Sequence, residues 1–333
     1  MRMKPASNTL DALIAGLRGR IVDQPDWQGM IALANQTLLT PALFTSLERA
    51  GLLERVPGDE RDYLQFIRDC NRERNVRLRS QLNEAVAALN GIGVAPVLLK
   101  GAVPLFRSQV ALDRITSDLD LAVAARDEAL AQARLEELGY VPLTDGRGLV
   151  RDLDVGVLEL RSYRADGFAR PKLVRQGDYV VKIPSPQSRC LHWIAHDLLK
   201  EGDYWRGRID LRHIFDLAQL AESEPVDWAG LRASLPDKSA RNAVDTQLLA
   251  LYRFFGTSIP RECGERALIR FQHWRRVFAS SHPILGWPLR LAGNLLWGAR
   301  RFSRVRDLAR HDPVHLAHRI AIVLLNKNLR SKV

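Results

Sequence analysis

The feature that most constrains this chain is a pair of aspartates, Asp118 and Asp120, in a segment that alternates with Leu119, Leu121 and Val123. Successive strand side chains point to opposite faces, so both carboxylates project from one face, roughly 7 Å apart at the backbone, while the apolar residues bury the other. Two adjacent carboxylates repel each other unless a cation lies between them. Oxygen ligands select Mg²⁺ or Mn²⁺, and Mg²⁺ is commonly held by carboxylates together with substrate phosphates. The spacing predicts a metal–phosphate site; two solvated acids on an edge strand are the alternative.

A second motif precedes the aspartates. The apolar run Val94–Leu99 has strand character, breaks at Lys100-Gly101, and is followed by a helix-like stretch from about Val103. Glycine lets a phosphate approach the backbone, and the N-terminus of the following helix favours negative charge. Lys100 and Gly101 are therefore candidate phosphate-binding residues.

Together the two motifs resemble a known family. A strand that ends in Lys-Gly, followed by Arg-x-x-Ser-Asp-x-Asp at residues 114–120, is similar to the nucleotidyltransferase-fold proteins of the DNA polymerase β superfamily, and most to its uncharacterised bacterial branch. The likeness is firm over residues 92–125 and looser to about residue 220. It implies a glycine that opens a helix against a nucleoside triphosphate, an Asp-x-Asp pair that holds two divalent metals, and a third carboxylate on a neighbouring strand.

The third carboxylate has one leading candidate. The run Val155–Leu160 is apolar apart from Glu159, and an acid within such a strand is costly unless it is paired or bound to metal. Glu159 is therefore the predicted residue, with Asp154 as the competing candidate and Asp152 as a weaker one. The resembling family usually carries Leu-His-Trp after this acid, whereas this chain has Leu-Arg-Ser, so the His-Trp dipeptide is missing.

Three more residues are candidates for contacts to the nucleotide. Arg114 could neutralise a triphosphate oxygen, and a surface arginine is the alternative. Ser117 is expected to support the turn or a phosphate, since no His or Lys base stands beside it. Lys182 is a weaker phosphate-contact candidate on the last expected strand. Many polymerase β relatives have Ser after the glycine motif, whereas this chain has Ala102.

A segment further along also resembles the family. Residues 206–211, with Phe-Asp-Leu at 215–217, look like its segment ending in Asp-Leu and like the Arg-Asp motif of nucleotidyltransferase toxins from phage-abortive systems. The resemblance implies that Arg208 and Asp210 border the nucleotide pocket. A helix-to-helix ion-pair network is the alternative.

His192 and His196 stand four residues apart, on one face of an expected helix, and could bind zinc. No Glu follows His192, so the zincin motif is absent. An HD-type phosphohydrolase based on His196-Asp197 is a further alternative.

The hydrophobic pattern predicts an α+β fold, of α/β type. A small mixed-sheet nucleotidyltransferase core at residues 91–184 is expected between a helical N-terminal lobe at 1–90 and a helical C-terminal lobe with a basic tail at 185–333. A long helix should run from about Asp59 to Asn90, with a solvated, Arg/Glu-rich middle from Arg68 to Arg79.

Finer expectations follow from the spacing of apolar residues. A helix at 130–138 should be capped by Gly139, with strands at Val155–Leu160 and Tyr179–Ile183. Too few β-α-β units appear for a doubly wound sheet, so a hairpin or a mixed sheet with helices on one side is expected. Helical periodicity also appears at Leu38, Leu39, Leu43 and Leu47, at Leu291, Leu295, Phe302 and Val305, and in helices expected at Cys190–Leu199, Leu211–Leu220, Ala240–Phe255, Arg266–Phe278 and Pro288–Leu308.

Composition describes an ordinary soluble protein, with 333 residues, 46% hydrophobic and 26% charged. Cys70, Cys190 and Cys263 are widely separated, which fits a reducing compartment without disulfides. The chain has no apolar run of about 18 residues, as a membrane span would need. A cytoplasmic protein is predicted.

The net charge of +11 is concentrated at the C-terminus, where ten Lys and Arg face two acids from Arg290 onward. A basic tail of this kind suggests an anionic partner such as RNA or a membrane surface. A solvated helical face is the alternative, and the more common one.

The resemblance implies a metal-dependent nucleotidyltransferase that moves a nucleoside monophosphate from an NTP, guessed as ATP, to an unidentified hydroxyl, small molecule or RNA, and releases pyrophosphate. Mg²⁺ or Mn²⁺ would be held by Asp118, Asp120 and Glu159, with Glu159 orienting or deprotonating the acceptor and Lys100 and Gly101 seating the triphosphate. The alternatives are a toxin-like enzyme that adds nucleotides to tRNA, its basic tail binding phosphates, and an inactive nucleotide-binding or scaffold protein.

Overall fold

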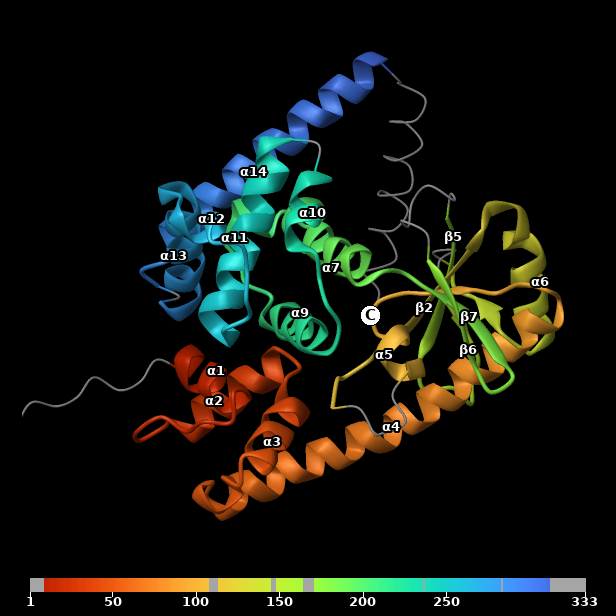
Figure 1. Ribbon diagram of the computed structural model, residues 1–333, viewed down its shortest axis with the longest axis horizontal. Helices are drawn as coiled ribbons and strands as arrows, with labels where there is room; N and C mark the ends of the chain where they lie inside the picture. Colours follow the sequence, from red (N-terminus) through yellow and green to blue (C-terminus); the bar gives the residue numbers. More distant parts are fainter. Residues whose placement is uncertain are drawn as a thin grey trace, which may run out of the picture.

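The structure is a computed structural model that describes residues 9–107, 113–144, 148–163, 171–235, 237–282 and 284–311, with side chains up to residue 300. Figure 1 shows a sheet with its helices at one end and a larger group of helices at the other, with the long helix α4 (Gly58–Gly91) along one edge between them. The predicted α+β class, with a mixed sheet and flanking helices, is confirmed.

The sheet has seven strands in the order β3-β4-β5-β2-β1-β7-β6. Its strands are β1 (Val97–Leu98), β2 (Asp118–Ala124), β3 (Val141–Pro142), β4 (Gly148–Val150), β5 (Val157–Tyr163), β6 (Lys172–Gln176) and β7 (Tyr179–Ile183). The pairs β2–β5 and β1–β7 are parallel, and the other neighbours are antiparallel. The sequence located β7 correctly and β2 to within one residue, placed β5 two to three residues early, made β1 too long, and did not predict β3, β4 and β6.

Helices cover one face of the sheet, as predicted. They are α4, α5 (Ala102–Arg107) and α6 (Glu128–Glu137). Leu119, Leu121 and Val123 of β2 are buried in the core between these helices and the sheet. The aspartates of β2 alternate with them and so project from the opposite face. Gly139 follows α6 with φ of +90°, in agreement with the predicted cap.

The middle of α4 contradicts the expectation of a solvated stretch at Arg68–Arg79. Asn75 is 1% exposed, and Arg74 donates hydrogen bonds to the carbonyls of Thr116 and, at 2.7 Å, of Val155. These two carbonyls lie just before β2 and β5. The charged residues of α4 therefore fix the starts of the two strands that carry the predicted acids.

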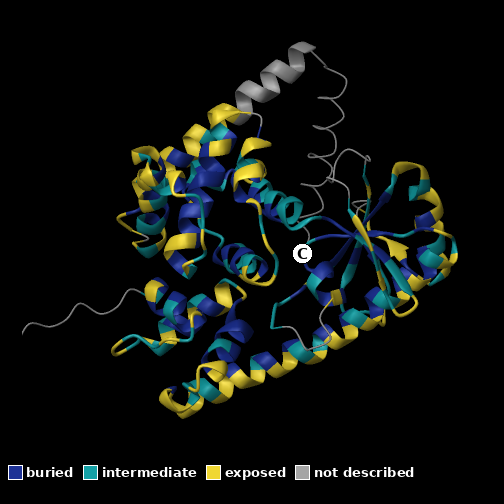
Figure 2. Ribbon diagram, viewed as in Figure 1, coloured by how far each residue is buried: buried dark blue, intermediate teal, exposed yellow. Residues whose placement is uncertain are grey.

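The helices at the two ends of the chain share one hydrophobic core (Figure 2). Leu13, Leu43 and Leu47 are fully buried in the same cluster as Ile214 and Leu248. Burying each such side chain contributes about 1.5–3 kcal/mol. The chain thus leaves this core along α4, builds the sheet, and re-enters the core through α7 (Pro186–Ile194).

The N-terminal helices are α1 (Thr9–Leu17), α2 (Trp27–Gln36) and α3 (Thr40–Arg49), followed by the 3₁₀ turn η1 (Leu53–Arg55). Asp26 caps α2 by accepting a hydrogen bond from the Gly29 amide at 2.9 Å. The expected helical face does not extend through Leu38 and Leu39. Leu38 has φ of +58° and is 40% exposed, because the chain turns there before α3 begins.

After α7 the chain is helical, as predicted. The elements are the π-helical segment η3 (Ala195–Lys200), α8 (Asp203–Arg206), α9 (Leu211–Ser223), α10 (Trp228–Ala233), α11 (Lys238–Phe255), α12 (Glu262–Glu265), α13 (Ala267–Ser281) and α14 (Trp287–His311). Leu291 and Leu295 are 42% and 66% exposed, so the buried face expected there is wrong for these two. Phe302 and Val305 lie outside the described side chains.

Two predicted absences can be compared with the described residues. Cys70, Cys190 and Cys263 are all free thiols. Among the described helices, none combines the length and apolar character needed to cross a bilayer.

Replacing Arg74 tests whether α4 holds the strand starts. Arg74→Gln should lower the free energy of unfolding by about 2–3 kcal/mol, because hydrogen bonds from a charged donor are lost and two carbonyls lose their partner. Urea unfolding followed by circular dichroism measures this loss. Arg77→Gln, at an exposed position of the same helix, is the control and should change stability little; equal losses for the two variants would contradict the bracing role.

Candidate active site

Three of the predicted acids converge on neighbouring strands. Parallel pairing of β2 with β5 aligns Asp120 with Glu159 and Asp118 with Val157. One carboxylate oxygen from each of the three acids lies within 4.8 Å of the others. Hard oxygen donors this close fit a divalent cation such as Mg²⁺ or Mn²⁺.

The competing acids lie elsewhere. Both carboxylate oxygens of Asp154 accept hydrogen bonds from Arg151, each at 3.1 Å. Asp152 is exposed in the preceding turn. The cluster found among the described residues therefore contains Glu159 and neither alternative.

Asp120 is the buried centre of the cluster. Its carboxylate Oδ1 lies 2.8 Å from Lys100 Nζ and 3.4 Å from Arg161 Nη2, and the residue is 1% exposed. Burial raises the pKa of Asp120, the Lys100 charge opposes that rise, and the charges of Asp118 and Glu159 add to it. Its other oxygen, Oδ2, is buried without a hydrogen-bond partner among the described residues. An unpartnered buried carboxylate oxygen is the group that a bound cation would satisfy.

The Lys100-Gly101 turn is tightly packed. Lys100 has φ of +43°, and the Ala102 amide donates to the Leu99 carbonyl at 3.0 Å. A Cβ on Gly101 would lie 2.6 Å from Nη1 of Arg114. A side chain at this position would therefore displace the Arg114 guanidinium, and α5 begins directly after this turn.

Arg114 and Ser117, in the loop before β2, are both held by side-chain hydrogen bonds. Arg114 donates from Nε to Asp216 of α9 at 3.0 Å, and its side chain is only 15% exposed, so the alternative of a free surface arginine is wrong. Ser117 donates its hydroxyl to Asp118 Oδ1 at 2.9 Å. The loop before β2 is therefore tied to the helical part of the molecule, and one catalytic candidate is oriented by its neighbour.

The remaining candidates for contacts to the nucleotide do not all lie near the three acids. Lys182 alternates with Val181 and Ile183, which are buried on the helix-covered face, so it lies on the same face of the sheet as the acids. Arg208 is exposed and lines a different cavity, of about 250 Å³, which contains none of the three carboxylates. Asp210 caps α9 and lies 3.2 Å from His213 of the same helix.

A cavity of about 280 Å³ lies between α3, α5, α7 and α9. Its lining includes the cations Arg49, Arg114, Arg189 and Arg212, the acids Asp113 and Asp216, and the aromatic residues Trp193 and Phe215. Arg189 and Trp193 also line a small cavity of about 10 Å³ against Lys100. The larger cavity therefore lies next to the Lys100 turn, and cations outnumber acids in its wall.

Sequence reasoning missed two residues at this site. Arg161 stands where the family motif has His, and it forms ion pairs with Glu159 and Asp120. His192 lines the small cavity with Lys100, and its Nε2 is buried without a partner among the described residues. Burial, with the charge of Lys100 next, lowers the pKa of His192 to about 4. The helical spacing of His192 marked it as a candidate site residue, but the role predicted for it was zinc binding and not this contact.

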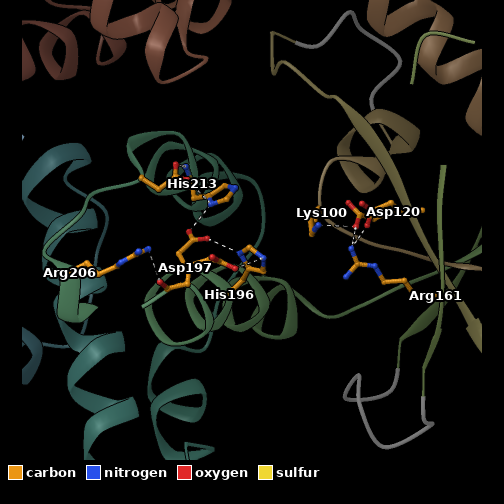
Figure 3. A network of polar contacts seen from close by, with 10 residues as sticks. Lys100, Asp120, Arg161, His196, Asp197, Arg206 and His213 are labelled. Atoms are coloured by element: carbon orange, nitrogen blue, oxygen red, sulfur yellow. Dashed lines mark hydrogen bonds and ion pairs between the residues drawn. The ribbon is translucent and has the colours of Figure 1, made fainter. Parts of the chain in front are cut away.

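The facing side of the molecule carries a second polar cluster. Figure 3 shows Lys100, Asp120 and Arg161 on the sheet side, and His196, Asp197 and His213 on the helices opposite. His196 contacts Asp197, with 3.2 Å between Nδ1 and Oδ1. The predicted zinc pair of His192 and His196 is not among the metal-type groups found in the described residues.

Comparison with known proteins identifies the family. Residues 23–256 match a family described as uncharacterised nucleotidyltransferases. The chain belongs to this family. Nucleotidyl transfer is thus the general activity of its class, and a nucleotide is the class of substrate. A search of curated proteins gives no match.

Two solved structures show a distant likeness. An antigenic nucleotidyltransferase-like protein from Paracoccidioides brasiliensis is 17% identical, with a TM-score of 0.37, over 54% of this chain and 89% of that one. The antibiotic-resistance factor ANT(2'')-Ia is 16% identical, with a TM-score of 0.29, over 63% of this chain and 96% of that one.

Replacing Arg161 tests whether it competes with a cation. Arg161→Gln should raise the affinity for Mn²⁺ by about tenfold, because removing one partly buried charge beside the acids relieves on the order of 1 kcal/mol or more of repulsion. Isothermal titration calorimetry measures the affinity. Arg126→Gln, at an arginine with an 87% exposed side chain, is the control; unchanged or weaker binding in Arg161→Gln would contradict the competition.

Proposed function

We propose that this chain is a metal-dependent nucleotidyltransferase that transfers a nucleoside monophosphate from an NTP to an acceptor hydroxyl. The observation that carries the proposal is the convergence of Asp118, Asp120 and Glu159 within 4.8 Å on adjacent strands, in a chain of a nucleotidyltransferase family. ATP is the first NTP to test. Residues 91–184 are proposed as the catalytic core, with 1–90 and 185–333 as the helical lobes.

The three acids would hold Mg²⁺ or Mn²⁺, which when bound stabilises charge on the phosphates and on the attacking oxygen. Glu159 orients the acceptor hydroxyl and takes its proton. The acceptor oxygen forms a bond to the α-phosphorus, the bond from the α-phosphorus to the α,β-bridging oxygen breaks, and pyrophosphate leaves with that oxygen. No other oxidant, reductant or co-substrate is required.

The cations around the acids seat the triphosphate. Lys100, at 2.8 Å from Asp120, is placed to turn to a phosphate oxygen, with the Gly101 backbone beside it. Arg114, fixed by Asp216, and Lys182 offer further positive charge, and Ser117 orients Asp118. Arg208 and Asp210 stay proposals for the border of the pocket, with Asp210 also serving as the cap of α9.

The acceptor is proposed to carry negative charge. The cavity beside the Lys100 turn is lined by four arginines and two aspartates, and a surplus of cations in a partly enclosed wall attracts anions. Trp193 and Phe215 offer an apolar surface for a ring. A phosphate-bearing small molecule fits this wall better than a polycation does.

RNA is the second candidate acceptor, because the same cavity and the basic tail favour it. The tail arginines Arg301, Arg304 and Arg310 lie outside the described side chains. An inactive nucleotide-binding protein is the third possibility, and Arg161 within the acidic cluster is the observation that favours it.

Replacement of the acids tests the catalytic proposal. Asp118→Asn and Glu159→Gln should each reduce transfer by at least about a hundredfold, because both remove a charged oxygen from the reacting centre. Transfer is measured as incorporation of label from the α-phosphate of each NTP into the small-molecule and RNA fractions of a cell extract. Asp154→Asn is the matched control and should retain most activity; a larger loss in Asp154→Asn than in Glu159→Gln would move the third carboxylate.

Charge reversal at the cavity rim tests the anionic acceptor. Arg49→Glu should raise the acceptor's KM several-fold while the KM for the NTP stays nearly unchanged, since long-range attraction is lost at one site only. Arg55→Glu, an exposed arginine outside the cavity lining, is the control. With RNA as the acceptor, reversal of the three tail arginines should also reduce the slope with which the affinity falls as the salt concentration rises. An unchanged slope would favour the small-molecule acceptor.

A further inference from the structure

A second group of metal-type side chains lies outside the proposed catalytic site. The π-helical segment η3 carries His196 and Asp197, and Asp210 and His213 stand at the start of α9. Ligand atoms of Asp197, Asp210 and His213 all lie within 4.8 Å of one another. Figure 3 shows Asp197 between the rings of His196 and His213. π-helical turns inside helices occur frequently at functional sites.

The donor atoms converge on one side of the His213 ring. Nδ1 of His213 lies 2.6 Å from Oδ2 of Asp197 and 3.2 Å from Oδ2 of Asp210. A tetrahedral ion with bonds of about 2.0–2.1 Å holds its ligand atoms about 3.3 Å apart. The edge from His213 to Asp210 already has this length, and the edge from His213 to Asp197 would have to lengthen by about 0.7 Å. The third edge, between the two aspartates, is no longer than 4.8 Å.

Each carboxylate is also oriented through its other oxygen. Oδ1 of Asp210 accepts from the backbone amide of His213 at 2.9 Å, and Oδ1 of Asp197 lies 3.2 Å from Nδ1 of His196. Both Oδ2 atoms are left facing His213. Supporting hydrogen bonds that leave the ligating atoms free are the arrangement that metal sites use.

Burial lowers the pKa of His213 but Asp197 and Asp210 raise it overall, so a divalent ion would compete with a proton at this site. Two carboxylates face one imidazole, and Asp197 is 4% exposed. Arg276, the buried guanidinium on which both aspartates act electrostatically, donates instead to the Arg208 carbonyl and to Gln247, at 2.7 and 3.0 Å. A divalent cation balances both carboxylates while the imidazole stays neutral.

We propose that Asp197, Asp210 and His213 bind one divalent transition-metal ion, with Zn²⁺ as the ion that fits best, through two carboxylate oxygens and one imidazole nitrogen. Three protein ligands leave one position open to solvent or to a further ligand. The imidazole distinguishes this site from the all-oxygen cluster on the sheet, since Mg²⁺ prefers oxygen and Zn²⁺ accepts nitrogen. The ion joins η3 to α9 beside Arg212, which lines the large cavity.

The test uses the full-length chain with the sheet cluster removed. The double variant Asp118→Asn/Asp120→Asn, stripped of metal, should bind one Zn²⁺ per chain by calorimetry and by metal analysis after dialysis. Adding Asp210→Ser should weaken binding at least about tenfold, because the serine oxygen keeps the α9 cap but the ligand oxygen is lost. Adding Glu201→Gln, at an acid 3.9 Å from the His196 ring and outside the ligand set, should leave binding unchanged.

Two results would overturn the proposal: no Zn²⁺ bound to the folded double variant, or equal affinity with and without Asp210→Ser. If circular dichroism shows that Asp210→Ser does not fold, the double variant loaded with Co²⁺ decides. It should show visible absorption bands of a four- or five-coordinate ion with a nitrogen ligand, and featureless octahedral absorption would reject the site. No nucleotide takes part, so failure here is separate from failure of the proposed transferase activity.

Discussion

The structure depends on the register of two parallel strands. Pairing of β2 with β5 places Asp120 against Glu159 with Asp118 beside them, and a backbone ladder cannot relax to let these charges separate. Their mutual repulsion in a partly dry site has to be offset by cations. Lys100 and Arg161 supply two positive charges against three negative ones. Arg74 and Arg212 also act electrostatically on Asp118, so the unpartnered Oδ2 of Asp120 is the physical reason to expect a cation there.

Other contacts in the fold hold that register and enclose the large cavity. Arg74 of α4 holds the carbonyls that precede both strands, and Arg114 ties the loop before β2 to Asp216 on α9. Helices from both ends of the chain share one core, so the wall of the large cavity is built from parts of the sequence more than a hundred residues apart. A site formed by the sheet and the helices together therefore requires helices that precede the sheet and helices that follow it in the sequence.

What the sequence could predict follows from how local each signal is. The alternation around Asp118 and Asp120 predicts that both side chains share one face of the strand. The single acid in an apolar run, Glu159, predicts the third carboxylate beside them. Strands of two or three residues, such as β3 and β4, are too short to leave a periodic pattern. The charged middle of α4 has the composition of a solvated helix. Its hydrogen-bond partners are backbone carbonyls beyond residue 110, which the composition of the helix does not reveal. Arg161 looked like the loss of a motif, whereas the structure shows a cation inside the cluster.

That substitution leads to a coupling between metal and phosphate. In the structure Lys100 and Arg161 both contact Asp120, so a divalent ion that binds there takes over the charge they neutralise. Both side chains then have positive charge available for phosphate oxygens. A triphosphate bound as proposed would in turn draw them away from the acids and strengthen the binding of the ion. By linkage each ligand must raise the affinity for the other by the same factor. If a metal ion and a nucleotide bind as proposed, Arg161 would weaken the empty metal site and strengthen the nucleotide-bound one, and would so tie metal binding to the presence of substrate.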